Sequence, residues 1–297
     1  MYPRPAQRRT SLAVLAVVAS CVLAGCGGNS EADTAPASDA SAPLHDALPK
    51  MLQGEDSITI ASNVEYPPFE FYDTDNKTVL GIDRLIADGL ERQLGIGIEF
   101  ENISFDAIIP GLASGRYEMA MSAMTDNVER QQEVDFVDYF SAVAGILAKE
   151  GDADTFTDLT AMCGTTVGIV KGTTEVAQAE DQSKACVDAG DEEIESIVFP
   201  GQNQAVLALQ NGRVQAVLMD SAPGGYVASQ TPGLAMSQPY ESQPFGIVFA
   251  KGTDELQSAV QQALEALRAN GEYGDALAEF GLEKSGLEEF PVNGGTQ

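Results

Sequence analysis

Residues 166–187 read TVGIVKGTTEVAQAEDQSKACV, and this stretch carries the pattern that decides the fold. Its first five residues, 166–170, are mostly apolar and β-branched, which is typical of a buried strand. Gly172 interrupts the strand, and residues 173–187 have the length and composition of a helix. A strand followed closely by a helix is the repeating unit of an α/β fold.

The same alternation extends in both directions, from residue 57 to residue 281. Apolar residues recur at helical spacing over 82–94, and Gly95 follows as a stop signal. The expected strands are 57–62, 98–100, 118–122, 144–148, 166–170, 194–199, 215–219 and 247–250. The expected helices are 82–94, 105–113, 173–187, 203–211, 254–269 and 273–280. This order predicts parallel sheets covered by helices on both faces.

The length of this region favours two lobes, because about 225 ordered residues are many for one doubly wound sheet. The breaks follow the charged stretch 149–154 and precede the stretch 242–246. Residues 57–148 plus 246–281 would form lobe 1, residues 152–242 an inserted lobe 2, and residues 282–297 a C-terminal tail. A ligand would lie between the lobes, where strand ends and helix N-termini converge.

The first 25 residues have the pattern of a secretory signal. Arg4, Arg8 and Arg9 precede an apolar stretch, 12–23, that is shorter than a membrane span of about 20 residues. The stretch leads into LAGC at 23–26, which resembles the bacterial lipobox. The resemblance implies an extracytoplasmic protein, anchored to the outer face of the cell membrane through a diacylated Cys26. An ordinary secretory signal or a short membrane anchor is the alternative.

Residues 26–56 are rich in Gly, Ser, Ala, Asp and Pro and predict a flexible tether with a reach on the order of 30 Å. The single histidine, His45, falls within it, so we expect a folded body without histidine. That would exclude His-based acid–base catalysis, Ser-His-Asp triads and His-ligated zinc from the body. We expect no metal site and no cofactor.

The chain is strongly acidic, with 16 Lys+Arg against 45 Asp+Glu and a net charge of -29. Residues 1–25 hold three of the arginines and no acid, so the remaining chain has a net charge near −32. Nucleic acids and anionic lipid surfaces both need basic patches on a protein partner. The composition therefore argues against both as partners.

Two cysteines, Cys163 and Cys186, remain once Cys21 leaves with the signal and Cys26 carries lipid. In an oxidising compartment we expect them to form a disulfide. The closed loop of about 24 residues would contribute roughly 3 kcal/mol by chain-entropy arithmetic. A metal pair or a redox site is the alternative, but there is neither CxxC spacing nor a nearby histidine.

Several motifs, taken in order, resemble the bacterial extracellular solute-binding proteins of family 3, the polar amino-acid binding proteins of ABC importers. The first-lobe motifs are YPPFEF at 66–71, GID at 81–83, FDAIIPGL at 105–112, MTDNVER at 124–130 and VDF at 134–136. The later ones are GTT at 172–174, NGRVQAVLMD at 211–220 and FGIVFAKG at 245–252. The chain departs from the family at Leu85, where a second acid is usual, at Asn127, where threonine is common, and after Asp138, where proline is usual.

The resemblance covers nearly the whole body and implies a fold of periplasmic-binding-protein type II, with two doubly wound α/β lobes joined by a two-strand hinge. It implies a monomeric binding protein, not an enzyme, that captures a free amino acid between closing lobes and delivers it to an ABC permease in the membrane. One alternative is a ligand-sensing protein for a membrane receptor. Another is a cyclic-acid dehydratase on the same fold, which would need a placed acid and base.

A free amino acid is a zwitterion, so its site needs a cation for the carboxylate and an anion for the ammonium. The resemblance assigns the ligand carboxylate to Arg130, Thr125 and Thr174, and the ammonium to Asp220, Ala123 and Thr125. From the residues alone, Arg130 is also consistent with a surface pair to Glu129 or Glu133. Thr174 is equally consistent with an ordinary helix start, and Asp220 with an N-cap.

The resemblance assigns the ligand side chain to Asn63, Tyr66, Phe105, Val170 and Met219. Tyr66 and Phe105 are also consistent with plain core aromatics. Asn63 stands where proteins for cationic amino acids tend to carry an acid. Glu65 is the nearest acid, and the sequence does not give its direction. Without a counter-charge in the pocket, we predict a neutral or polar ligand such as glutamine, rather than lysine or arginine.

Overall fold

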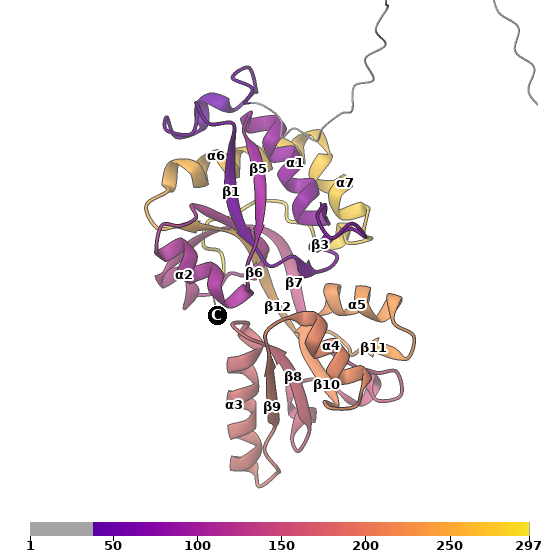
Figure 1. Cartoon of the computed structure of the whole chain (residues 1–297). Coiled ribbons are helices and arrows are strands. Elements are labelled where there is room, and N and C mark those ends of the chain that lie inside the picture. The colour runs from indigo at the N-terminus through magenta and orange to yellow at the C-terminus, as the bar shows by residue number, and fades with distance from the viewer. Residues whose placement is uncertain (1–37, 297) are drawn as a thin grey trace, which may run out of the picture. The chain divides into compact units, whose positions relative to one another are not determined.

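A nine-stranded sheet forms the centre of the computed structural model, which describes residues 38–296 (Figure 1). The strand order is β5-β1-β6-β12-β7-β10-β8-β9, and β11 pairs with β7. These strands are β1 (Ser57–Ser62), β5 (Gly97–Asn102), β6 (Met119–Thr125), β7 (Val134–Lys149), β8 (Thr166–Val170), β9 (Glu195–Phe199), β10 (Ala216–Asp220), β11 (Leu234–Met236) and β12 (Glu241–Ala250). A separate small sheet holds β2 (Glu65–Tyr66), β3 (Glu70–Tyr72) and β4 (Val79–Leu80).

Seven α-helices lie among the described residues. They are α1 (Ile82–Leu94), α2 (Ile108–Ala113), α3 (Thr174–Ala189), α4 (Gln202–Gln210), α5 (Ser221–Gln230), α6 (Asp254–Asn270) and α7 (Glu272–Ala278). The sequence pattern predicted all of these except α5, which contains Pro223, Gly224 and Gly225 and therefore has a poor intrinsic helix propensity. None of the helices in residues 38–296 combines the length and the apolar character needed to cross a membrane.

Two long strands connect the halves of the sheet. The first part of β7 pairs antiparallel with β12, from Val134 with Ala250 to Ala144 with Glu241. Its last residues pair with β10 and β11 instead. The sequence predicted only residues 144–148 of β7 as a strand, because Asp135 and Asp138 interrupt the apolar pattern. The structure gives both acids polar surroundings, including Lys251 and Asn293 beside Asp135.

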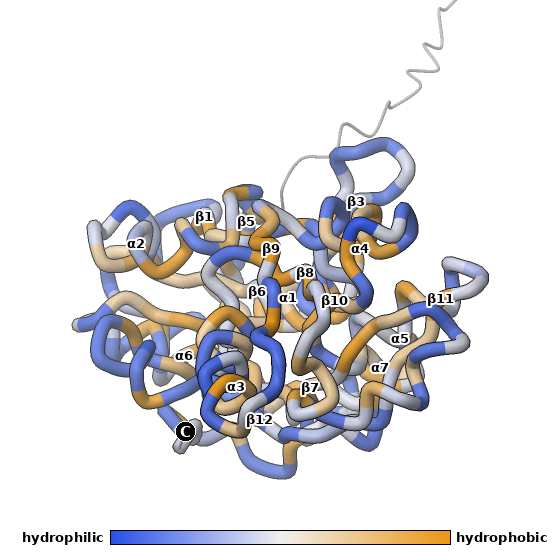
Figure 2. Tube along the Cα trace, turned by 90° about the horizontal axis from the view of Figure 1, so that it is seen from below, coloured by the Kyte–Doolittle hydropathy of each residue, from blue (hydrophilic) through white to orange (hydrophobic). Residues whose placement is uncertain are grey.

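Each half of the sheet has hydrophobic clusters on both faces. In the half that contains β1, β5 and β6, helices α1, α6 and α7 cover one face and α2 covers the other. In the half that contains β8, β9 and β10, α3 lies on one face and α4 on the other. Figure 2 shows hydrophilic residues (blue) in many of the connecting loops and hydrophobic residues (orange) along parts of helices such as α4 and α5. This two-lobed, doubly wound arrangement is the predicted fold class.

The segment before β1 differs from the predicted flexible tether. Residues 39–56 pack on the end of α1, where Leu48 and Leu52 are buried in the main core cluster. His45 is also buried, and its ring nitrogens lie 3.0 Å from Leu94 O and 3.2 Å from Gln53 O. The prediction of a folded body without histidine is therefore wrong. Leucines at 44, 48 and 52 follow helical spacing, and this signal lies within an otherwise polar stretch.

The segment after α7, predicted only as a C-terminal tail, runs beside β7. Gly286 bridges to Phe140 and Val292 to Val137, and Phe290 is buried. The Gly295 N–H donates to Asp126 Oδ2 at 2.8 Å. Gln131 Nε2 donates both to Asp126 Oδ1 and to Gly295 O, each at 2.8 Å. The C-terminal segment thus makes hydrogen bonds with the loop that follows β6.

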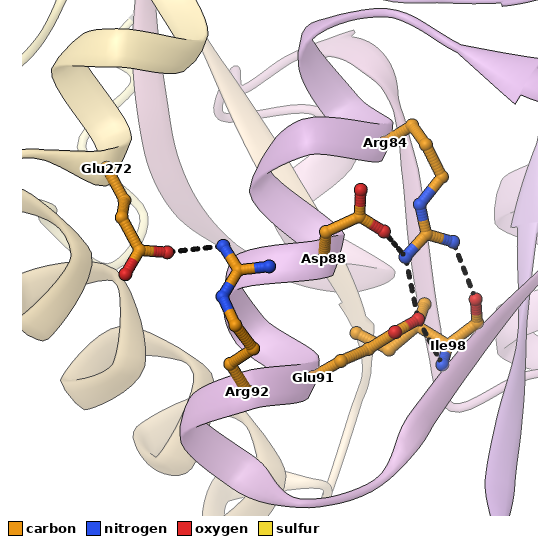
Figure 3. Close-up of polar contacts among 6 residues, drawn as sticks. All are labelled: Arg84, Asp88, Glu91, Arg92, Ile98 and Glu272. Atoms are coloured by element: carbon orange, nitrogen blue, oxygen red, sulfur yellow. Dashed lines mark hydrogen bonds and ion pairs between the residues drawn. The ribbon is translucent and has the colours of Figure 1, made fainter. Parts of the chain in front are cut away.

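Polar contacts tie α1 to its neighbours (Figure 3). Arg84 donates to the Ile98 carbonyl at 2.9 Å and lies 2.6 Å from carboxylate oxygens of both Asp88 and Glu91. Glu91 in turn accepts the Ile98 N–H at 2.9 Å, so α1 is fixed to the start of β5. Arg92 pairs with Glu272 and links α1 to the first turn of α7.

The two remaining cysteines form the predicted disulfide. The Cα atoms of Cys163 and Cys186 are 5.6 Å apart, within the usual range for a disulfide. The bond joins the turn before β8 to the last turn of α3. The disulfide prediction is confirmed. Cys26 and the signal sequence 1–25 lie outside the described residues.

Candidate ligand pocket

One pocket collects residues from both halves of the sheet. Its lining residues are Asn63, Tyr66, Glu70, Phe105, Ser122, Ala123, Thr125, Arg130, Val170, Thr173, Thr174, Glu175, Gln202, Leu218, Met219 and Asp220. Most lie at or just beyond the carboxyl ends of β1, β6, β8 and β10, or at the start of α3 and α4. Strand ends and helix N-termini are where α/β sheets place ligands.

All ten residues predicted to contact ligand line this pocket. The structure therefore brings together side chains that are up to 157 positions apart in the chain, from Asn63 to Asp220. The pocket also includes six residues that the sequence did not single out, namely Glu70, Ser122, Thr173, Glu175, Gln202 and Leu218. Glu65 is not among the lining residues. A Cβ built on Gly201, at the N-terminus of α4, would lie 2.5 Å from Glu65 Oε2, so the Glu65 carboxylate is turned toward α4.

Arg130 is held in the loop after β6. Asn127 Oδ1 accepts the Arg130 N–H at 2.8 Å, which is the capping role that its short polar side chain predicts. The guanidinium donates to Thr125 O at 2.7 Å and to Gly172 O at 3.1 Å, and lies 5.7 Å from the centre of the Phe105 ring. Burial lowers the pKa of Arg130, but an arginine remains protonated at neutral pH.

The surface pairs that were the alternative role of Arg130 do not form in the described part of the chain. Among residues 38–296, no carboxylate oxygen lies within 4.0 Å of a guanidinium nitrogen of Arg130, including those of Glu129 and Glu133. Both recorded partners of the guanidinium are neutral carbonyl groups. The positive charge therefore faces the pocket without a protein anion in contact.

Asp220 lies at the end of β10, opposite Arg130. The Tyr66 hydroxyl donates to Asp220 Oδ2 at 2.8 Å across the two halves. Asp220 occupies the N-cap position of α5, but its side chain makes no capping hydrogen bond. The N-cap alternative is thus not the role of this carboxylate in the structure. Burial, and then the negative charge of Glu175, raise the pKa of Asp220 well above its usual value.

The N-terminus of α3 forms a second wall. The Gly172 backbone has φ +84°, and a Cβ there would lie 2.8 Å from Asp106 Cβ, so glycine permits both the turn and the close approach of the halves. Thr174 begins α3, and its hydroxyl lies 3.5 Å from Glu175 Oε2. Glu175 is 5% exposed, and burial raises its pKa. The first N–H groups of a helix lack intrahelical partners and favour negative groups.

Below the pocket, buried acids form a polar network. Ser122 Oγ donates to Glu70 Oε1 at 2.9 Å and accepts the Asn63 N–H at 2.9 Å. The Tyr139 hydroxyl donates to Asp83 Oδ1 at 2.6 Å. Glu70 Oε2 and Asp83 Oδ2 are buried without a hydrogen-bond partner among the described residues. Burial and the Asp83 charge raise the pKa of Glu70 well above its usual value.

Ala123 adds backbone strain at the same place. Its φ is +44°, in the left-handed region that residues other than glycine rarely adopt. Such strain persists only where the surroundings impose it, and it concentrates at ligand sites. The Ala123 carbonyl was predicted to accept a hydrogen bond from the ligand ammonium. The strained backbone therefore lies at a residue whose carbonyl direction matters for binding.

The sequence gives only a weak signal for Glu175 and Glu70, the two acids that it did not predict in the pocket. Glu175 follows the GTT motif, but an acid in the first turn of a helix is common and usually solvated. Glu70 lies within the YPPFEF motif, yet nothing local shows that its side chain points inward. Contacts between distant segments, such as Ser122 with Glu70 and Arg130 with Gly172, lie beside these buried carboxylates.

Comparisons with known proteins show which family this chain matches. Residues 58–283 match the family model of bacterial extracellular solute-binding proteins, family 3. An arginine-binding protein, ArgT, of Corynebacterium glutamicum is 28% identical over 303 residues, which cover 98% of each chain. The ABC transporter glutamine-binding protein GlnH of Bacillus subtilis is 25% identical, over 95% of this chain and 98% of its own.

A solved structure extends the comparison to the fold. An ancestral arginine-binding protein bound to arginine has 30% sequence identity and a TM-score of 0.70, and covers 76% of this chain and 99% of its own. The family and this structure have the type II periplasmic-binding-protein fold. The relatives are named as binding proteins and not as enzymes, in agreement with the prediction for this chain.

Proposed function

Because this chain belongs to the bacterial extracellular solute-binding proteins of family 3, we propose that it is the substrate-binding component of an ABC importer that captures a free amino acid and delivers it to a membrane permease. The observation that carries the proposal is the placement of Arg130 and Asp220 on opposite halves of the sheet, facing one pocket. A zwitterion can bridge these two charges, which an uncharged solute cannot do.

The proposed contacts follow the chemistry of each group. The ligand carboxylate meets the planar Arg130 guanidinium, with further hydrogen bonds from Thr125 and from Thr174 at the start of α3. The ammonium meets Asp220, the Ala123 carbonyl and Thr125. The ligand side chain lies among Asn63, Tyr66, Phe105, Val170 and Met219.

We propose that residues 57–148 plus 246–281 and residues 152–242 move as two lobes about β7 and β12. The contacts that join these parts across the pocket include Tyr66 with Asp220 at 2.8 Å, Arg130 with Gly172 at 3.1 Å, and Lys171 with Asp106 at 2.7 Å. Contacts that exist only when the lobes meet favour the closed state, and a bridging ligand adds its own. A bridging ligand therefore shifts the equilibrium toward the closed state.

The predicted neutral character of the ligand rested on the absence of a counter-charge in the pocket. That premise is wrong, because Glu175 lines the pocket. The relatives described above are named for arginine and for glutamine, so they do not fix the charge of the ligand of this chain. We propose a free α-amino acid as the ligand.

We also propose that Cys26 carries a diacyl anchor, with residues 1–25 removed as a signal sequence. The LAGC motif at 23–26 supports this, and two acyl chains suffice for stable membrane attachment. Expression in a bacterial host should place the wild-type protein in the membrane fraction, whereas Cys26→Ser should release it. Wild-type protein that is recovered in the soluble fraction without lipid mass would refute the anchor.

A thermal-shift screen of the full-length protein against the twenty amino acids tests the binding function. A true ligand at 100 times its dissociation constant stabilises the native state by about 2.7 kcal/mol. Glucose, spermidine and glycine betaine, which lack the α-amino acid group, should leave the midpoint unchanged. If no amino acid raises the midpoint, the proposed function is wrong.

A further inference from the structure

The loop 126–133, which carries Arg130, is attached to a part of the chain that lies far away in sequence. The loop joins β6 to β7 and contains the short 3-10 turn Arg130–Gln132. Within the loop, the Asn127 side chain and carbonyl accept the N–H groups of Arg130 and Gln131. These local hydrogen bonds shape the turn, but they do not fix where the turn lies relative to the sheet.

The attachment is a cluster of three residues, Asp126, Gln131 and Gly295, which we call the Asp126 cluster. Gln131 Nε2 donates to Asp126 Oδ1 and to Gly295 O, each at 2.8 Å. The Gly295 N–H donates to Asp126 Oδ2 at 2.8 Å. Asp126 is 2% exposed, so water competes little for these bonds. A buried polar group that loses its partner costs about 1–3 kcal/mol, which favours the closed cluster.

The close approach of Gly295 requires the absence of a side chain. A Cβ at this position would lie 2.2 Å from the Asp126 carbonyl oxygen, far inside any real contact distance. Any other residue would therefore have to displace either the loop or the segment that meets it.

The segment that contains Gly295 is itself fixed to β7. Phe136 N–H donates to Asn293 Oδ1 at 2.8 Å, and the Asn293 N–H donates to Phe136 O at 3.1 Å. The Asp138 N–H donates to Pro291 O at 2.9 Å. The Asp126 cluster thus ties the loop 126–133 to β7, one of the two strands that connect the halves of the sheet.

Resting on the proposed function, we propose that the Asp126 cluster positions Arg130 for the ligand carboxylate. The recorded partners of the guanidinium are Thr125 O at 2.7 Å and Gly172 O at 3.1 Å, and Gly172 belongs to the other half of the sheet. When the halves separate, the Gly172 contact is lost, and Thr125 and the cluster remain to hold Arg130. A bidentate bond to a carboxylate depends on the direction of the guanidinium, so the position of the loop contributes to affinity.

Hydrogen exchange on the ligand-free, full-length protein tests the first step. Gln131→Leu removes both side-chain donors of the cluster while keeping a similar size. Peptides that cover residues 126–132 should exchange about threefold faster or more than in the wild type, because the loop opens more often. Gln132→Leu, the same change at the exposed neighbouring residue, should exchange as the wild type does.

The binding test compares a free amino acid with its α-carboxamide, which keeps the ammonium and the side chain but lacks the carboxylate. The probes are whichever of the twenty amino acids gives the largest thermal shift, and its carboxamide, measured by calorimetry. Gln131→Leu should bind the free amino acid about tenfold more weakly, or about 1.4 kcal/mol. Its preference for the free acid over the amide should fall by a similar factor. A purely structural loss would weaken both ligands alike and leave the preference unchanged.

Gly295→Ala opens the cluster from its other side and should give the same two changes. Its control is Gly274→Ala, where an added Cβ would meet no atom within 4 Å. Agreement between the two cluster variants does not depend on the folding of either one alone.

The outcomes separate this inference from the proposed function. Wild-type exchange in the loop, or a wild-type preference for the free acid, in both cluster variants would overturn the positioning role while the amino-acid function stands. If none of the twenty amino acids binds the wild type, the proposed function fails and the positioning role fails with it.

Discussion

At the scale of single residues, the Arg130 site shows how the chain prepares a cation for an anion. Asn127 caps the turn, Thr125 O holds one edge of the guanidinium, and the Phe105 ring lies against it. These contacts fix the direction of the side chain before any ligand arrives. A preorganised, planar cation binds a carboxylate more tightly than a flexible cation does.

We predict that Arg130→Lys lowers amino-acid affinity at least 30-fold, about 2 kcal/mol, although the charge is retained. A lysine ammonium is a point donor and cannot offer two parallel N–H groups to a carboxylate. Calorimetry with the best ligand from the thermal screen measures the loss. Arg213→Lys, on an exposed arginine that lies against Phe199, serves as the control and should bind normally. Normal binding by Arg130→Lys would mean that the carboxylate lies elsewhere.

The sequence could place every proposed contact residue in one pocket, because the motifs are short and keep their order. The sequence could not show which additional acids line the pocket. Glu175 and Glu70 have ordinary local surroundings, and their burial arises from contacts between segments about 50 residues or more apart. Side-chain direction across a domain interface is a tertiary property, and no local pattern encodes it.

At the scale of elements, the predicted strands and helices exist, and the departures occur where an element depends on a distant partner. β7 continues through Asp135 because Lys251 and Asn293 contact that acid, and through Asp138, which is buried beside Asp126. The C-terminal segment has no periodicity, yet it lies along β7 and reaches Asp126. The segment 39–56 is ordered because Leu44, Leu48 and Leu52 pack in the core cluster at the end of α1. Local propensity is neutral in each case, and packing decides.

The contacts of α1 give a test with an internal control (Figure 3). The Arg84 side chain is 19% exposed and contacts Asp88, Glu91 and the Ile98 carbonyl, whereas Arg92 is 57% exposed and contacts Glu272. We predict that Arg84→Ala destabilises the protein by about 1–3 kcal/mol, because it leaves Glu91 and a backbone carbonyl with fewer partners. Arg92→Ala should cost less than about 1 kcal/mol, since exposed pairs contribute little.

Urea unfolding monitored by circular dichroism measures both changes. Equal losses from the two variants would contradict the idea that burial, and not the presence of an ion pair, sets the contribution. The comparison should be made at one salt concentration, because the exposed Arg92 pair is screened more strongly than the Arg84 network.

At the scale of the whole molecule, the body combines a large negative charge with buried acids whose pKa values are raised. Burial raises the pKa of Asp83 to about 7, and burial together with the Asp126 charge raises that of Asp138 to about 8. Burial and the Asp83 charge raise the pKa of Glu70 well above its usual value. The acids whose pKa is lowered, such as Asp75 and Asp158, titrate below this range.

These raised values fix the direction of the pH dependence. Between an unfolded pKa near 4 and a folded pKa of about 8, the native state holds a proton on Asp138 that the unfolded chain has released. Stability must therefore fall as pH rises through this window, by at most about 1.4 kcal/mol per pH unit for one group. We predict that the unfolding free energy is higher at pH 5.5 than at pH 7.5, and that Asp138→Asn has a shallower slope.

The reason lies in the geometry around Asp138, which is 1% exposed and hydrogen-bonded to Asp126. An asparagine amide donates to Asp126 as the protonated acid does, but it cannot ionise, so the variant keeps the contact and loses the titration. Asp154→Asn, an exposed acid outside this cluster, removes the same charge and should leave the wild-type slope unchanged. Parallel slopes for wild type and Asp138→Asn would show that Asp138 is already ionised in the folded protein, and the C-terminal segment would then rest against two charged carboxylates.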